Sequence, residues 1–248
     1  MLDRLRMARG VIRSLRIYYC DRARAAAMER LYAKFVKPGD LVFDVGAHVG
    51  DRIRAFRRLG AKVIAIEPQP ALATVLRLLY GRDRDVIIEA VAVGRNAGVV
   101  SLKLNVSNPT ISTASDDFVS AAAASPRWRK ERWSKSVPVP VTTLDCLIER
   151  HGTPAFAKID VEGFEAEALA GLSGAIPALS FEFTTLQRDV AARALARCVE
   201  LGYRRFNAAL GESQIFVFAQ HVDAATVGAW LAGLSEAANS GDVYALLD

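Results

Sequence analysis

The stretch LVFDVGAHVGD, residues 41–51, decides the fold. An apolar run leads into Asp44, and two glycines, Gly46 and Gly50, follow before a second acid, Asp51. Glycine lets the backbone approach a ligand and lets a helix begin close to the preceding strand. The stretch therefore predicts a buried strand that ends in a turn built to hold a ligand.

Short apolar strands alternate with helical patterns along most of the chain. The predicted strands are LVFDVG, KVIAIEP, DVIIEAVAVG, AFAKID and LSFEF. This alternation is typical of parallel βαβ units, with helices on both faces of an open sheet. Near the end, YRRFNAA and QIFVFAQ flank a short polar turn at 211–213, so we expect them to pair antiparallel. The expected fold is α/β, an open and mostly parallel sheet with one late antiparallel strand.

Composition limits the class of protein. With 248 residues, 52% of them hydrophobic, the chain can form one domain of ordinary size. It has no run of 18 apolar residues and no separate apolar leader, so we expect a cytoplasmic location. The three cysteines are widely spaced and the three histidines match no zinc-ligand spacing, which argues against structural disulfides and zinc.

Positive charge is concentrated at the N-terminus. Residues 1–36 carry nine Arg or Lys and three Asp or Glu, so the rest of the chain is close to −1 although the whole is +5. We divide the chain into a basic helical extension, 1–37, and a domain, 38–248, that has a C-terminal helix at about 223–238. Because the domain itself is not basic, we do not expect a nucleic acid partner.

The first 20 residues have the pattern of an amphipathic helix. Apolar residues recur three or four positions apart: Leu5, Ala8, Ile12, Leu15 and Tyr19. Arginines lie mostly between them. Such a helix can dock on the domain or contact a second copy in a homodimer, lie on an anionic membrane surface, or contact RNA.

A region rich in Ser, Thr, Asn, Asp and Pro, about 105–136, interrupts the alternation of strands and helices. We interpret it as an insertion on the substrate side of the domain. Within it, RWRKERW offers Trp128, Arg129 and Trp133 as acceptor contacts, since tryptophan stacks on sugars and arginine holds anionic groups. The alternative is a surface helix with two packed tryptophans.

The acids at the strand ends indicate the ligand. The turn at 44–50 is not the dinucleotide pattern G-x-G-x-x-G, and Asp44 would repel a pyrophosphate. Glu67 ends the next strand, where a carboxylate can accept both hydroxyls of a ribose. A ribose beside a cationic group favours S-adenosylmethionine over a nicotinamide dinucleotide.

Five segments, in order and spacing, resemble the FkbM-type family of class I S-adenosylmethionine-dependent methyltransferases: VFDVGAHVGD, IAIEP, EAVAVG, VTTLD and FAKIDVEGFEAEALAGL. The resemblance covers about residues 38–220. It implies a Rossmann-like fold with seven strands, parallel apart from one. It also implies cofactor contacts from Asp44, Gly46, His48 and Gly50 at the methionine end, Glu67 at the ribose, and Glu89 or Ala90 near the adenine.

Methyl transfer to an alcohol requires that the hydroxyl lose its proton, which calls for a base or a metal ion. Asp160 ends the strand AFAKID and is the first candidate for the base or for the group that orients the hydroxyl. Glu162 is the second candidate and Glu182, in LSFEF, the third. A divalent ion held by Asp160 and Glu182 is compatible with this pattern but not expected. These acids could also simply cap the helix that follows.

The function that we expect is O-methylation of a hydroxyl on a sugar, a glycan or a polyketide-like natural product. S-adenosylhomocysteine would be the second product. One alternative is an RNA or amino-group methyltransferase, although no Asn/Asp-Pro-Pro-aromatic motif follows Asp160. The other is an inactive scaffold that binds the cofactor.

Overall fold

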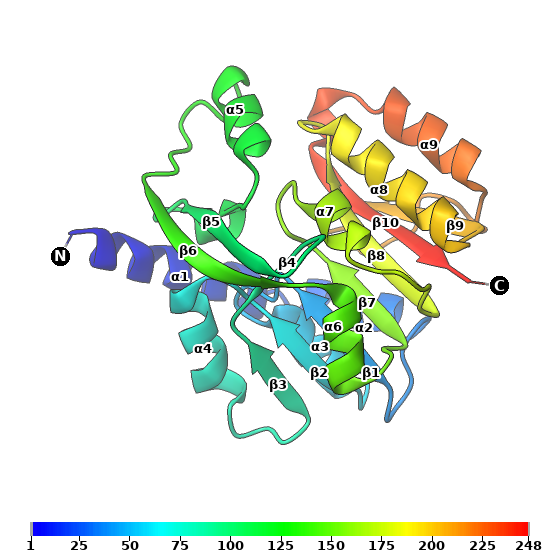
Figure 1. Cartoon of the computed structure of the whole chain (residues 1–248), viewed down its shortest axis with the longest axis horizontal. Coiled ribbons are helices and arrows are strands. Elements are labelled where there is room, and N and C mark those ends of the chain that lie inside the picture. Colours follow the sequence, from blue (N-terminus) through cyan, green and yellow to red (C-terminus); the bar gives the residue numbers. More distant parts are fainter. Residues whose placement is uncertain (1, 248) are drawn as a thin grey trace.

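The main sheet has seven strands in the order β3-β2-β1-β7-β8-β10-β9 (Figure 1). The computed structural model describes residues 2–247, with side chains from residue 6, so the side chain of Leu5 is outside the described part. The strands are β1 Leu41–Val45, β2 Lys62–Ile66, β3 Val86–Glu89, β7 Phe156–Ile159, β8 Ala178–Thr184, β9 Arg205–Leu210 and β10 Ser240–Leu246. Only β10 runs antiparallel to its neighbours in this sheet. The predicted α/β fold is confirmed.

Helices cover both faces of this sheet. On one face lie α2 Arg22–Tyr32, α3 Asp51–Arg58 and α4 Pro70–Tyr80. On the other lie α6 Leu144–His151, α7 Glu165–Ala170, α8 Arg188–Leu201 and α9 Ala224–Gly233. Successive strand residues point to opposite faces, so Val42 packs with α2 and α3 while Phe43 packs toward α6 to α9. Each face therefore has its own apolar core.

An aromatic cluster forms the centre of the core on the α2 and α3 face. Phe156 is fully buried, and its ring lies 5.6 Å from that of Tyr32 and 5.1 Å from that of Phe35. Phe56 packs on the same ring at 6.1 Å. The cluster joins α2, α3 and β7, so it fixes the helices against the middle of the sheet.

A second, three-stranded sheet has the order β4-β6-β5. Its strands are β4 Ala92–Val93, β5 Gly98–Leu104 and β6 Lys135–Thr142. The predicted strand DVIIEAVAVG is thus two strands in two sheets, because the chain leaves the main sheet after Glu89. The predicted insertion joins β5 to β6 and is more regular than expected, with a 3₁₀ turn η1 at Pro109–Ile111 and α5 at Asp116–Ala124.

The antiparallel strand is not the one that the sequence suggested. QIFVFAQ, 214–220, forms only one isolated bridge to β9, between Phe216 and Ala209, and its Ile215 is 69% exposed. The chain instead continues through α9 and the 3₁₀ turn η2, Glu236–Ala238, into β10. Val243 in β10 has no exposed surface. β10 takes the inner position between β8 and β9 because its residues are apolar enough for burial on both faces.

The N-terminal extension is helical, as predicted. It consists of α1, Leu2–Cys20, and α2, and Asp21 caps the start of α2 by accepting a hydrogen bond from the Arg24 N–H. Among the described residues, no helix combines the length and the apolar character needed to cross a bilayer.

Replacing Phe156 with alanine should lower the free energy of unfolding by about 3–5 kcal/mol, because the change leaves a cavity among packed rings. Urea denaturation followed by circular dichroism measures this loss. Leu78→Ala is the matched control, since Leu78 is 81% exposed and its removal should change stability by less than about 0.5 kcal/mol. Equal losses in the two variants would contradict this account of the core.

Candidate active site

A cavity of about 290 Å³ lies at the carboxyl ends of β1, β2, β7 and β8. Its lining includes the predicted cofactor residues Gly46, His48 and Glu67 and the predicted catalytic acids Asp160, Glu162 and Glu182. Segments far apart in the sequence complete the wall: Tyr18, Trp128, Glu212, Asn239 and Ser240. Ligands of open α/β sheets bind at this edge, so the cavity is the candidate active site.

Gly46 is required by the geometry of the turn. Its φ is 87°, and a Cβ at this position would lie 1.8 Å from the carbonyl oxygen of Asp160. The backbone at β1 and β7 is therefore in direct contact where both strands end. The N–H groups of Gly46 and Ala47 donate to the carbonyl oxygen of Ile66, which fixes the turn against β2.

Glu67 is positioned by two backbone donors. Its carboxylate accepts hydrogen bonds from the N–H of His48 and the N–H of Gln69, both at 2.8 Å. Burial raises the pKa of Glu67 to about 8, although these two bonds oppose the rise. A carboxylate has about four acceptor sites, so two remain for the hydroxyls of a ribose.

Asp44 lies beneath the lining and is fully buried. Neither of its carboxylate oxygens has a hydrogen-bond partner within the described chain. Burial raises the pKa of Asp44 to about 7, and the nearby Arg52 acts against the rise. A buried carboxylate without a partner indicates a missing donor, and the ammonium end of S-adenosylmethionine has the charge to supply one.

His48 has a backbone φ of 48°, a left-handed conformation that is uncommon outside glycine. Its ring packs edge-on against Tyr18 of α1, with 5.3 Å between centroids. Burial lowers the pKa of His48 to about 4, so the imidazole is neutral at pH 7. Tyr19 donates to the carbonyl of Val49 and Tyr80 to that of Gly50, so α1 and α4 brace the glycine turn from outside.

The three predicted catalytic acids come together. One carboxylate oxygen from each of Asp160, Glu162 and Glu182 lies within 4.8 Å of the others. Burial raises the pKa of Glu162 and of Glu182 well above the usual range, and the negative charge of Asp160 adds to the rise. The cluster can therefore hold a proton between its members at neutral pH.

Asp160 differs from the two glutamates because cations flank it. Its Oδ2 lies 3.1 Å from Lys158 Nζ and 3.2 Å from Arg52 Nη2. Burial alone would raise the pKa of Asp160, but Lys158 and Arg52 outweigh burial and lower it. Lys158 has no exposed surface and also contacts Asp242 of β10 at 2.8 Å. Asp160 is thus held ionised and in a fixed position.

The loop that carries Glu162 is held in a strained conformation, since Glu162 has a φ of 54°. The hydroxyl of Thr113 donates to the carbonyl oxygen of Glu162 at 2.7 Å. Glu165 accepts hydrogen bonds from the N–H groups of Val161 and Gly163. The insertion between β5 and β6 therefore supports one of the candidate acids directly.

The structure gives different surroundings to the remaining predicted contacts. Trp128 lines the cavity, whereas Trp133 donates its indole N–H to the carbonyl of Ile111 at 2.8 Å. Arg129 is exposed and is not part of the lining. Phe118 packs edge-on against both tryptophans, so both belong to the fold of the insertion, and Trp128 also faces the cavity.

Glu89, which the resemblance predicted near the adenine, pairs with Arg150 and His151, each at 2.9 Å. Neither Glu89 nor Ala90 is in the lining, which includes Val91, Ala92 and Val93 instead. Asp44 and Gly50 also lie outside the lining, one beneath it and one behind the turn.

Sequence reasoning missed Gln69, Arg52, Tyr18, Glu212 and Asp242. Gln69 is only 6% exposed, lines the cavity, and leaves its side-chain oxygen without a partner in the described chain. Arg52 could have been predicted from the sequence, because it directly follows Asp51 at the end of the glycine turn. The other three come from distant segments, and no local pattern brings them to the site.

The order of the seven-stranded sheet and the glycine turn at the end of β1 fit the fold of class I S-adenosylmethionine-dependent methyltransferases. Residues 44–211 match the family model described as the methyltransferase FkbM domain. The chain belongs to the FkbM methyltransferase family, as the resemblance predicted, and its cofactor is S-adenosylmethionine. No protein of curated function matches the sequence.

Solved structures of similar shape include other methyltransferases. A precorrin-6y C5,15-methyltransferase from Geobacter metallireducens is 12% identical, with 91% of this chain and 87% of that chain covered and a TM-score of 0.43. A TehB-like S-adenosylmethionine-dependent methyltransferase from Corynebacterium glutamicum is 10% identical, with 90% and 88% covered and a TM-score of 0.46. Aeropyrum pernix fibrillarin with bound S-adenosylmethionine is 10% identical, with 86% and 68% covered and a TM-score of 0.44.

Asp44→Asn should weaken S-adenosylmethionine binding on the order of 10- to 100-fold, because it removes the charge opposite the ammonium. Binding to the normal chain should tighten as the pH rises through about 7 and about 8, since Asp44 and Glu67 must be ionised. In the variant, the part of this dependence near pH 7 should disappear. Titration calorimetry measures both effects, and Asp117→Asn, at an exposed position, is the control. Unchanged affinity in Asp44→Asn would refute the assignment.

Proposed function

We propose that the protein methylates the oxygen of an alcohol, on a sugar, a glycan or a polyketide-like natural product. The observation that carries the proposal is the cluster of Asp160, Glu162 and Glu182, in the same cavity as the cofactor residues. An alcohol is a weak nucleophile and needs a base close to its oxygen. S-adenosylmethionine supplies an activated methyl group on its sulfonium sulfur.

The surroundings of the three acids favour a division of roles. Asp160 is held ionised by Lys158 and Arg52, which makes it a weak base and a good orienting group. Glu182 and Glu162 have raised pKa values and lack such cations, so either can take the hydroxyl proton as the methyl group is transferred. Glu182 Oε2 is buried and without a partner in the described chain, so we assign the base to Glu182.

The polar lining supports a hydroxylated acceptor. Thr184, Asn239 and Ser240 offer hydrogen-bonding groups beside Glu182 and Glu212. Trp128 adds an aromatic face, which is a common contact for sugar rings. RNA is less favoured as an acceptor, because residues 37–248 carry a net charge of −1 and not the excess of Lys and Arg that is typical of nucleic-acid enzymes. An amino-group acceptor is distinguished from an alcohol by the atom that carries the methyl group in the product.

Glu182→Gln should lower turnover by about 10²–10⁴-fold while S-adenosylmethionine affinity stays the same. The assay measures S-adenosylhomocysteine release with a panel of glycosides and polyketide-type alcohols, and mass spectrometry locates the methyl group. Glu149→Gln, an exposed glutamate, is the control. Methylation of nitrogen, or full activity in Glu182→Gln, would contradict the proposal. S-adenosylmethionine binding without turnover on any acceptor class would favour the inactive scaffold.

Turnover should rise with pH until Glu182 is ionised, because only the carboxylate can accept the proton. Asp160→Asn removes a neighbouring negative charge and should therefore move the rise to lower pH. The measurement is the pH profile of kcat/KM for both proteins. A shift to higher pH would argue against this role for Glu182.

Addition of EDTA should leave turnover unchanged, because Asp160 Oδ2 already contacts Lys158 and Arg52. The same assay, repeated with Mg²⁺ after EDTA, checks this. Loss of turnover with EDTA and its return with Mg²⁺ would instead assign the three carboxylates to a divalent ion, which prefers oxygen ligands.

A further inference from the structure

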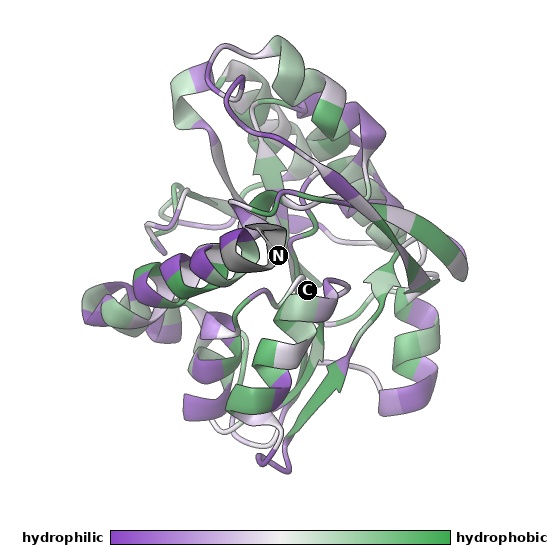
Figure 2. Cartoon of the chain, turned by 90° about the vertical axis from the view of Figure 1, so that its left-hand side faces the viewer, coloured by the Kyte–Doolittle hydropathy of each residue, from purple (hydrophilic) through white to green (hydrophobic). Residues whose placement is uncertain are grey.

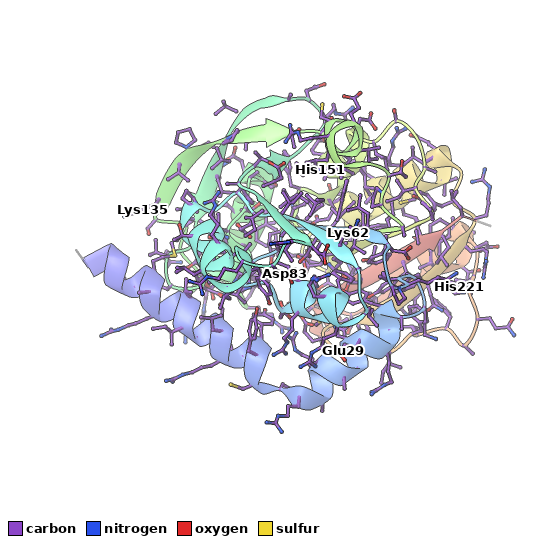
Figure 3. All side chains as sticks on the ribbon, turned by 90° about the horizontal axis from the view of Figure 1, so that it is seen from below. Glu29, Lys62, Asp83, Lys135, His151 and His221 are labelled. Atoms are coloured by element: carbon purple, nitrogen blue, oxygen red, sulfur yellow. The ribbon has the colours of Figure 1, made fainter. Side chains whose placement is uncertain are left out.

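The outer face of α1 has a composition that folding does not explain. We define it as Arg6, Arg9, Ile12, Arg13, Arg16 and Ile17, all of which are exposed. Figure 3 shows α1 along the outside of the molecule, with side chains directed away from the domain. Figure 2 shows hydrophilic and hydrophobic residues alternating along this helix. The question is what this face contacts.

The inner face of α1 packs against the domain. Gly10 lies so close to η1 that a Cβ there would be 2.7 Å from Pro109 Cδ. Val11 is buried against Val49 and Leu72. The buried side includes Gly10, Val11 and Ser14. Of the predicted apolar set, Leu15 and Tyr19 pack beside them, whereas Ala8 and Ile12 are exposed. That difference leaves Ile12, one of the predicted core positions, 51% exposed.

The positive charges of the outer-face arginines are not balanced by nearby acids. Within the described part of the chain, none of Arg6, Arg9, Arg13 and Arg16 forms an ion pair. At 3.6 residues per turn the four fall within an arc of about 80° on the helix. Ile12 and Ile17, each 51% exposed, lie at the two edges of this arc. The face is thus a positive stripe between two aliphatic side chains.

We propose that the outer face of α1 docks on an anionic lipid bilayer. Arginine side chains reach phosphate groups at the level of the lipid headgroups while their stems cover apolar surface. Ile12 and Ile17 insert at the two sides of the helix, as in helices that lie in the plane of a membrane interface. The domain, residues 37–248, has a charge of −1 and adds no general attraction to anionic surfaces, so the stripe determines the orientation.

Two other partners fit this face less well. Single-stranded RNA is held by aromatic stacking as well as by charge, but Tyr18 packs on His48 and Tyr19 bonds to Val49, both on the inner side. A second copy of the chain, related by twofold symmetry, would place positive stripes against each other. The bilayer supplies both the negative charge and the apolar depth that the face requires.

The test is flotation of the full chain with vesicles of phosphatidylcholine, with and without phosphatidylglycerol. We expect at least about tenfold stronger partition onto the anionic vesicles, falling as salt is added. Arg9→Glu with Arg13→Glu should remove this preference. Arg204→Glu with Arg205→Glu makes the same charge change at exposed positions by β9 and should leave binding unchanged. Ile12→Ser with Ile17→Ser should weaken partition without altering its salt dependence.

Affinity for S-adenosylmethionine shows whether each variant is folded. If Arg9→Glu with Arg13→Glu does not fold, Arg6→Glu with Arg16→Glu takes its place. The proposal does not rest on the acceptor of methyl transfer, so it can fail while the proposed function stands. It is overturned if anionic vesicles bind no better than neutral ones at low salt, or if both arginine pairs matter equally. It is also overturned if a single-stranded RNA, but no vesicle, binds with dependence on Arg9 and Arg13.

Discussion

Lys158 is the residue on which the site depends. Its ammonium group, without exposed surface, lies between Asp160 at the end of β7 and Asp242 on β10. An isolated buried charge would cost several kcal/mol, so the lysine requires both carboxylates. Between β7 and β10 runs β8, where the small Ser180 pairs with Lys158 in register. Lys158 thus joins two strands that do not touch and fixes the charge of Asp160 at the same time.

The acids of the cavity divide by their partners. Asp160 has two cations and Glu67 has two backbone donors, and both serve as fixed points of the geometry. Asp44 and Glu182 keep buried oxygens without partners in the described chain. Such groups are unfavourable in the free protein and become favourable when a ligand supplies the missing donor or positive charge. The residues least satisfied by folding are therefore those best placed to act on ligands.

The sequence was sufficient for what is local or periodic. The strand that ends at Asp44, the glycine turn and the acids at the strand ends all followed from spacing, and the structure places them at one edge. It was not sufficient for β10, because either apolar segment after β9 could pair beside that strand. Burial on both faces of the sheet selects β10 over QIFVFAQ. Asp242 and Glu212 were missed for the same reason. Their roles arise from contacts with residues more than 80 positions away, and neither segment carries a pattern of its own.

The position of β10 has a consequence for folding during synthesis. Although last of the strands in chain order, β10 occupies the interior of the sheet between β8 and β9. While the chain emerges from the ribosome, β9 has no neighbour to pair with and Lys158 lacks one of its carboxylates. The ion pairs of Lys158, and with them the position of Asp160, are therefore complete only when β10 inserts. Until β10 inserts, β8 has an unpaired edge, and unpaired strand edges promote aggregation.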